Sequence, residues 1–146
     1  MRMFAILRVV TKILLPYILL FALYVQFHGD FGPGGGFQAG VIFAAGIILY
    51  SIVFGLSAAR RVVSPGAVEI MIALGVLIYA FTGVATIVMG GKFLDYNALE
   101  HHTFTNIIPH GQHLGIFLVE AGVGITVAAV MIGVFYAFAG RERIAQ

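Results

Sequence analysis

Long runs of apolar residues dominate the sequence, and short polar or glycine-rich segments separate them. Four such runs occur, at about residues 9–27, 37–59, 67–90 and 114–139. Each is close to or above the roughly 20 residues that a helix needs to cross a hydrocarbon core of about 30 Å. The first is the shortest and includes a turn upstream of Ile13, with Arg8 and Lys12 extending to the membrane surface. The pattern predicts an all-α fold, a bundle of four transmembrane helices that forms a single domain over residues 1–146.

The composition excludes the other broad classes of protein. Hydrophobic residues make up 61% of the 146 residues and charged residues 10%, whereas soluble domains have about 45–50% and about 25%. Disordered chains have the opposite bias, with much charge and few apolar residues. The absence of cysteine excludes disulfides and thiolate metal ligands, and a net charge of +2 is too small for a nucleic-acid partner. The chain is therefore expected to lie in a lipid bilayer.

The basic residues are distributed unequally between the two ends of the predicted helices. With four spans, the two termini and the loop between the second and third spans share one side. That side holds seven of the eight basic residues: Arg2, Arg8, Lys12, Arg60, Arg61, Arg141 and Arg143. Lys92 alone lies on the other side. Because positively charged segments stay in the cytoplasm, both termini are predicted to be cytoplasmic.

The connection between the first two spans is the most distinctive segment. Residues 28–36 contain five glycines and one proline, which preclude a regular helix or strand. Turn chemistry alone accounts for a tight external hairpin, and no Lys-Ser/Thr pair follows the glycines as in a nucleotide-binding loop. Gly36, Gly40 and Ala44 then recur every four residues, so they share a helix face on which another helix can pack closely.

Small residues recur in the later spans as well. They are Gly75, Gly83 and Gly90 in the third span, and Gly115, Gly122, Ala129 and Gly133 in the fourth. A chain with four helices is too small to turn all of these faces inward. We therefore expect some of them to contact other subunits.

Two acidic residues fall within predicted spans. Glu120 lies six residues past Leu114, about 9 Å into the fourth span at 1.5 Å per residue. A charge there costs on the order of 2.5–3.5 kcal/mol, so the carboxyl group must be neutral, paired or beside a hydrated cavity. Two interpretations stay open: a protonated glutamate bonded to a neighbouring helix, or a relay for protons or cations. Glu69, in the first turn after Ser64 and Pro65, is better explained as stabilising a helix start.

The segment at residues 91–113 is rich in metal-binding residue types. It contains Asp95, Glu100, His101, His102, His110 and His113. Such side chains bind zinc in other proteins, but no helical or hairpin pattern holds the histidine pairs together here. No nucleophile with a base, and no pair of carboxylates, suggests covalent catalysis. We therefore predict no metal, no cofactor and no catalytic residue.

Two motifs together resemble a known family. They are the residues Pro33, Gly34, Gly35, Gly36, Phe37 and Gly40, and the fourth span around Glu120. They are similar to the MnhB family, the B-type subunits of multisubunit Mrp-type Na+/H+ antiporters, and the likeness covers nearly the whole chain. The resemblance implies an accessory subunit in a prokaryotic plasma membrane, which works with the other subunits of the complex to exchange Na+ and H+. It also implies that Glu120 corresponds to an acidic position in the family's last span.

Other functions fit the sequence less well. Subunits related to this family also occur in ion-pumping membrane-bound hydrogenases and similar respiratory complexes, and this is the main alternative. A scaffolding membrane protein would have no need of Glu120. A self-sufficient transporter is expected to have broken helices and internal repeats, and this sequence shows neither.

The predicted topology is testable with reporter fusions. Fusions after Arg61 and after Gln146 are expected to report a cytoplasmic location, and a fusion near Asn97 an external one. An external C-terminus would refute the four-span arrangement.

Overall fold

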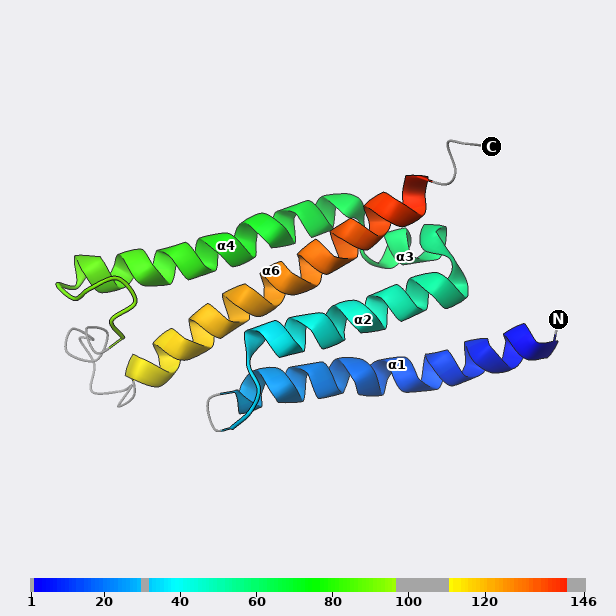
Figure 1. The fold of residues 1–146 in the computed structure, drawn as a ribbon, viewed down its shortest axis with the longest axis horizontal. Coiled ribbons are helices and arrows are strands. Elements are labelled where there is room, and N and C mark those ends of the chain that lie inside the picture. The colour runs from blue at the N-terminus through cyan, green and yellow to red at the C-terminus, as the bar shows by residue number, and fades with distance from the viewer. Residues whose placement is uncertain (1, 30–31, 97–110, 142–146) are drawn as a thin grey trace.

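The computed structural model describes residues 2–29, 32–96 and 111–141 (Figure 1). These residues form helices α1 (Arg2–His28), α2 (Gly36–Phe54), α3 (Leu56–Val62), α4 (Pro65–Val88) and α6 (Gly111–Arg141), and none of them forms a strand. Four of the helices are long and apolar enough to cross a membrane, which confirms the predicted fold class. The start of α1 and the end of α6 lie at the same end of the bundle (Figure 1). That this end of the bundle faces the cytoplasm stays a prediction.

The segment predicted as the second span is divided in the structure. Helix α2 ends at Phe54, and α3 begins at Leu56. Gly55 between them has a φ of 94°, a conformation that only glycine adopts without strain, and its N–H donates to the Ser51 carbonyl oxygen at 2.9 Å. The chain therefore turns at Gly55 and continues as a separate short helix.

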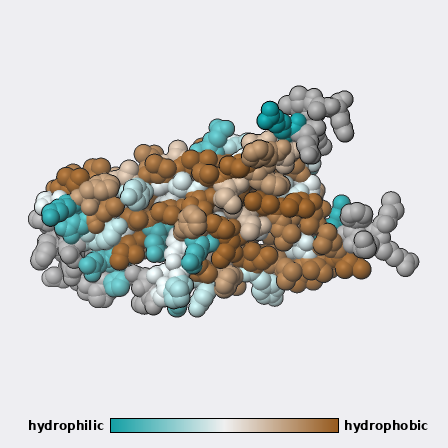
Figure 2. All heavy atoms as spheres, in the orientation of Figure 1, coloured by the Kyte–Doolittle hydropathy of each residue, from teal (hydrophilic) through white to brown (hydrophobic). Residues whose placement is uncertain are grey.

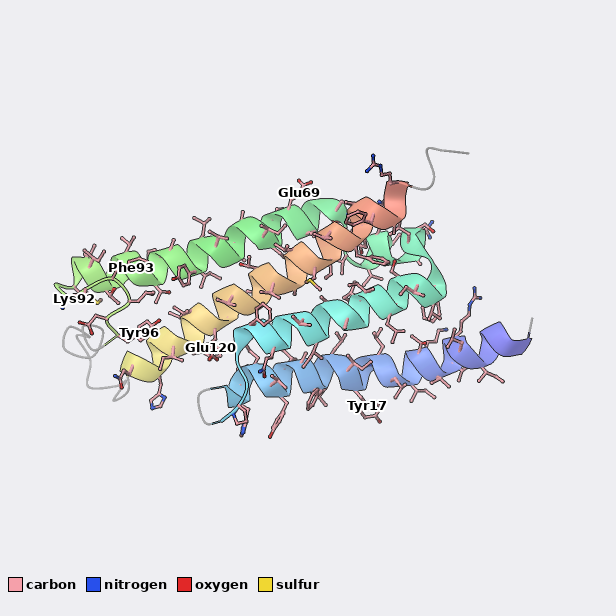
Figure 3. All side chains as sticks on the ribbon, viewed as in Figure 1. Tyr17, Glu69, Lys92, Phe93, Tyr96 and Glu120 are labelled. Carbon is pink, nitrogen blue, oxygen red and sulfur yellow. The ribbon has the colours of Figure 1, made fainter. Side chains whose placement is uncertain are left out.

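The predicted start of the third span is confirmed, but the expected position of Glu69 is wrong. Ser64 is the N-cap of α4, and its hydroxyl accepts the N–H of Ala67 at 3.2 Å. Because α4 begins at Pro65, Glu69 lies in the second turn and not in the first. Its side chain is exposed and points away from the bundle (Figure 3). A role for Glu69 in stabilising the first turn is not supported.

Helix α6 is the central element of the bundle. It packs against α4 on one side and α2 on the other, whereas α1 packs on α2 and makes few contacts with α6 (Figure 1). Hydrophobic residues cover much of the visible outer surface (Figure 2), and each of the four long helices has large apolar side chains that are exposed.

Glycines bring the backbones of α2 and α6 into contact. A Cβ atom on Gly36 would overlap the carbonyl oxygen of Glu120, and one on Gly40 would lie 2.6 Å from the carbonyl oxygen of Gly124. Further along the same interface, Ala44 and Ala129 are completely buried. No larger residue fits at this crossing, which is how membrane helices commonly gain packing contacts.

The contact between α4 and α6 has the same character. A Cβ atom on Gly75 would overlap the Thr126 hydroxyl and lie 2.6 Å from the Gly122 carbonyl oxygen. In return, a Cβ atom on Gly122 would lie 2.9 Å from the carbonyl oxygen of Gly75. The two helices therefore meet glycine to glycine.

Most of the small residues that could contact other subunits are already buried within the chain, and the expectation that some of them do so stays a prediction. The buried ones are Gly36, Gly40, Ala44, Gly75, Gly83, Gly115, Gly122 and Ala129. Gly133 is half-buried beside Val68, and Gly90 is exposed. Most of these residues turn inward because α6 presents different faces to α2 and α4, and the Phe93 ring covers Gly83.

Polar contacts fasten the short helix α3 to the end of α6. The Arg60 guanidinium donates to the Tyr136 carbonyl oxygen at 3.4 Å and lies 5.7 Å from the centre of the Tyr136 ring. The Tyr136 hydroxyl donates to the carbonyl oxygen of Val63 at 3.1 Å. Beneath them, Ala59 and Ile132 belong to a buried apolar cluster. These contacts hold α3, which follows the turn at Gly55, against the end of α6.

We predict that Gly40→Ala destabilises the fold and that Gly66→Ala does not. The added methyl at position 40 meets backbone of α6, an overpacking that typically costs about 1–3 kcal/mol. Gly66 is also helical but has no atom within 4 Å of an added Cβ. Thermal unfolding of the two purified variants in the same detergent measures the difference. Equal stability would contradict the close contact between α2 and α6.

Candidate functional site

Glu120 lies where α6 passes the glycine-rich connection. A Cβ atom on Gly35 would lie 3.0 Å from Oε1 of Glu120, and one on Gly29 would lie 2.7 Å from Oε2. The carboxyl group therefore rests against bare glycine backbone at the end of α1 and the start of α2 (Figure 3). The sequence presents the glycine motif and the acidic residue as separate features, and the structure brings them together.

Local backbone contacts shape this glycine cradle, which we define as Gly29, Gly34, Gly35 and Gly36. The N–H of Gly35 donates to the Val25 carbonyl oxygen at 3.3 Å, which ties the connection back onto α1. Gly35 has a φ of 117°, so it needs glycine both for its conformation and for the space that Glu120 occupies. A Cβ atom on Gly34 would lie 2.8 Å from the same Val25 oxygen.

The other residues of the predicted motif have different positions. Pro33 and Phe37 are exposed, and Phe37 retains 63% of its accessible surface. Gly40 lies one turn further along α2, against Gly124. Gly35, Gly36 and Gly40 thus contact α6 and Gly34 lies against the end of α1, whereas Pro33 and Phe37 are exposed.

The start of α2 gives the cradle a favourable electrostatic environment for a carboxylate. Gly35 is the N-cap of α2 and has no side chain with which to accept the first N–H groups of the helix. These groups carry the partial positive charge of the helix N-terminus, beside which the half-buried Glu120 side chain lies.

Gln26 of α1 joins the site one helical turn further into the bundle, and sequence reasoning missed it. Its Oε1 lies 2.7 Å from the position of a Cβ atom on Gly124, four residues beyond Glu120 on α6. Its Nε2 is buried and has no hydrogen-bond partner among the described residues. A single amide near the end of an apolar run carries no signal that marks it as part of a site.

A cavity of about 280 Å³ extends from Gln26 toward the middle of the bundle, between α1, α2 and α6. The aromatic rings of Phe27 and Phe117 stack with centroids 5.6 Å apart and lie at one end of it. Gln26 is the only lining residue with a polar side chain, and Phe43 and Ala128 are among the apolar ones. The site therefore combines one carboxyl group and one amide with an apolar cavity.

The segment that follows α4 turns back onto that helix, a feature that the sequence did not reveal. The Phe93 ring lies against Gly83, where a Cβ atom would overlap it, and meets the Tyr79 ring edge to face. The N–H of Leu94, which has a φ of 61°, donates to the buried Thr86 hydroxyl at 3.0 Å. Burial raises the pKa of Tyr96 nearby.

The histidine segment is only partly described. His113 is exposed at the start of α6, whereas Glu100, His101, His102 and His110 lie outside the described residues. No group of three or more candidate metal ligands occurs within the described ranges. The absence of a metal stays a prediction.

Comparisons with known proteins agree on one family. A family model described as "Domain related to MnhB subunit of Na+/H+ antiporter" matches residues 6–133, which include the cradle and Glu120. The chain is 32% identical over 135 residues to "Putative antiporter subunit mnhB2" of Staphylococcus haemolyticus, covering 92% of this chain and 94% of that protein. It is 30% identical over 129 residues to a Na+/H+ antiporter subunit of the B type from Alkalihalophilus pseudofirmus, covering 84% and 88%.

Proposed function

Because the chain belongs to the MnhB family of Na+/H+ antiporter subunits, we propose that it is the MnhB subunit of a multisubunit Na+/H+ antiporter in a prokaryotic plasma membrane. The observation that carries this function is the match with antiporter subunits of the same type over almost the full length of both chains. Four helices able to span a membrane agree with a multi-pass subunit. The alternative, a subunit of an ion-pumping hydrogenase, is not favoured, because the relatives are antiporter subunits.

The distribution of polar groups supports an accessory role within the complex. In the described parts of the four spans, the acidic residues are Glu69 and Glu120, which lie toward opposite ends of the bundle (Figure 3). Thr82, Thr86 and Thr126 each donate to a carbonyl oxygen of their own helix at 2.8 Å, so their hydroxyls are engaged. These groups do not form a polar route across the membrane. An ion that passes this chain must also use groups of partner subunits, so its path would lie at a subunit interface.

Glu120 is the residue of this chain that we propose to take part in that path. Its side chain is half-buried and lies beside the N-terminus of α2. The carboxyl group contacts the backbone of Gly29 and Gly35, which have no side chains. Such a group can bind and release a proton while its position stays fixed by the cradle. The competing interpretation is that Glu120 only packs, and an isosteric substitution separates the two.

We predict that Glu120→Gln leaves the complex assembled but lowers antiport or shifts its pH profile. The amide keeps the shape of the side chain and loses the titratable proton. Glu69→Gln is the matched control, because it makes the same change in an exposed residue of α4 and is expected to leave antiport unchanged. Na+-dependent proton flux in membrane vesicles, with subunit amounts measured in parallel, gives the result. Normal flux through assembled Glu120→Gln complexes would show that the carboxyl group is structural.

We also predict that the chain transports nothing by itself. Deletion of its gene is expected to abolish antiport by the whole complex, and return of the gene to restore it. The purified chain in Na+-loaded liposomes is expected to show no Na+-dependent proton flux, with the purified complex as the positive control. Robust flux from the lone chain would overturn the accessory role, and full antiport after deletion would overturn the proposed function.

A further inference from the structure

The outer face of α1 carries a polar group that no described part of the chain pairs. The side chain of Tyr17 is 66% exposed and points away from the bundle (Figure 3). Its hydroxyl makes no hydrogen bond with any residue that the structure describes. In water this would need no explanation, because solvent would pair with the hydroxyl.

Two helices place Tyr17 at the middle of the membrane. It lies at the centre of the apolar part of α1, Ala5–His28. Gly46, near the centre of α2, packs at the same level: an added Cβ there would lie 3.4 Å from Ile18 and 3.2 Å from Leu19. The midpoints of both spanning helices therefore coincide beside Tyr17.

A hydroxyl at this depth cannot reach water. The side chain of tyrosine is much shorter than half of a hydrocarbon core of roughly 30 Å, so it cannot extend to the surface as interfacial tyrosines do. Lipid chains offer no hydrogen-bond acceptor there, and an unpaired polar group in hydrocarbon is unfavourable. A protein group from outside the chain is the available partner.

Large exposed apolar side chains surround Tyr17 on this face of α1. Ile13, Leu20, Phe21 and Tyr24 lie on the same side of α1 by their helical spacing, and each is more than half exposed. Because α1 packs on α2 and makes few contacts with α6, none of the described helices covers this face.

We propose that a transmembrane helix of another antiporter subunit covers this face of α1 and presents a hydrogen-bond acceptor to the Tyr17 hydroxyl at the middle of the membrane. The acceptor is a carboxyl, amide or hydroxyl oxygen of that helix. The identity of the partner as an antiporter subunit rests on the proposed function, whereas the need for an acceptor rests on the depth and exposure of Tyr17.

The test compares Tyr17→Phe with Tyr50→Phe in the whole complex. Both substitutions remove only a hydroxyl, but Tyr50 lies on α2, outside this face of α1, and packs against the Phe54 ring near the end of that helix, where interfacial water reaches it. After extraction in detergent, Tyr17→Phe is expected to lower the recovery of the other antiporter subunits about threefold, the size expected for one interhelical hydrogen bond. Tyr50→Phe is expected to leave recovery unchanged. No loss with Tyr17→Phe, or equal losses with both, would overturn the proposal.

A photoreactive benzoylphenylalanine at position 17 identifies what covers the face. A crosslink to another antiporter subunit is the expected result. Crosslinks to lipid alone, or to a second copy of this chain, would overturn the proposal while leaving the proposed function intact. If the wild-type chain recovers no antiporter subunit, the proposed function fails as well.

Discussion

The close approach of backbones on both sides of α6 is the interaction on which the rest of the structure depends. In a bilayer the lipid is as apolar as the side chains, so helices associate through packing contacts and not through removal from water. Gly36 brings α2 against the backbone of Glu120, and Gly75 brings α4 against Thr126. Large side chains at either position would move a neighbouring helix away and leave α6 without its tightest contacts.

The same packing fixes the position of the candidate site. Glu120 contributes its backbone to the contact with Gly36 and its carboxyl group to the contacts with Gly29 and Gly35. One residue is thus held by its main chain and by its side chain, and both contacts involve glycines of one connection. Changes of volume at the cradle would alter the packing and the carboxyl group together, so only isosteric changes separate structure from proton chemistry.

Much of the fold could be predicted from the sequence, because uncharged runs of about 20 residues have few alternatives to spanning a membrane. The turn at Gly55 could not, since a single glycine is tolerated inside many helices. The contact of Glu120 with Gly35 depends on how α6 lies against the connection, which periodicity along one helix does not define. The number of helices alone does not show how many small-residue faces turn inward, because it leaves out the several faces that α6 offers to its neighbours.

The length of α6 has a consequence for how the bundle lies in a bilayer. Its 31 residues extend about 46 Å, whereas the 19 residues of α2 extend about 28 Å, close to the thickness of the hydrocarbon core. Helix α2 matches the core when nearly upright, but α6 must tilt or project beyond it, and it crosses its neighbours obliquely (Figure 1). The oblique course of α6 therefore accommodates a helix of this length in the same hydrocarbon core that α2 crosses nearly upright.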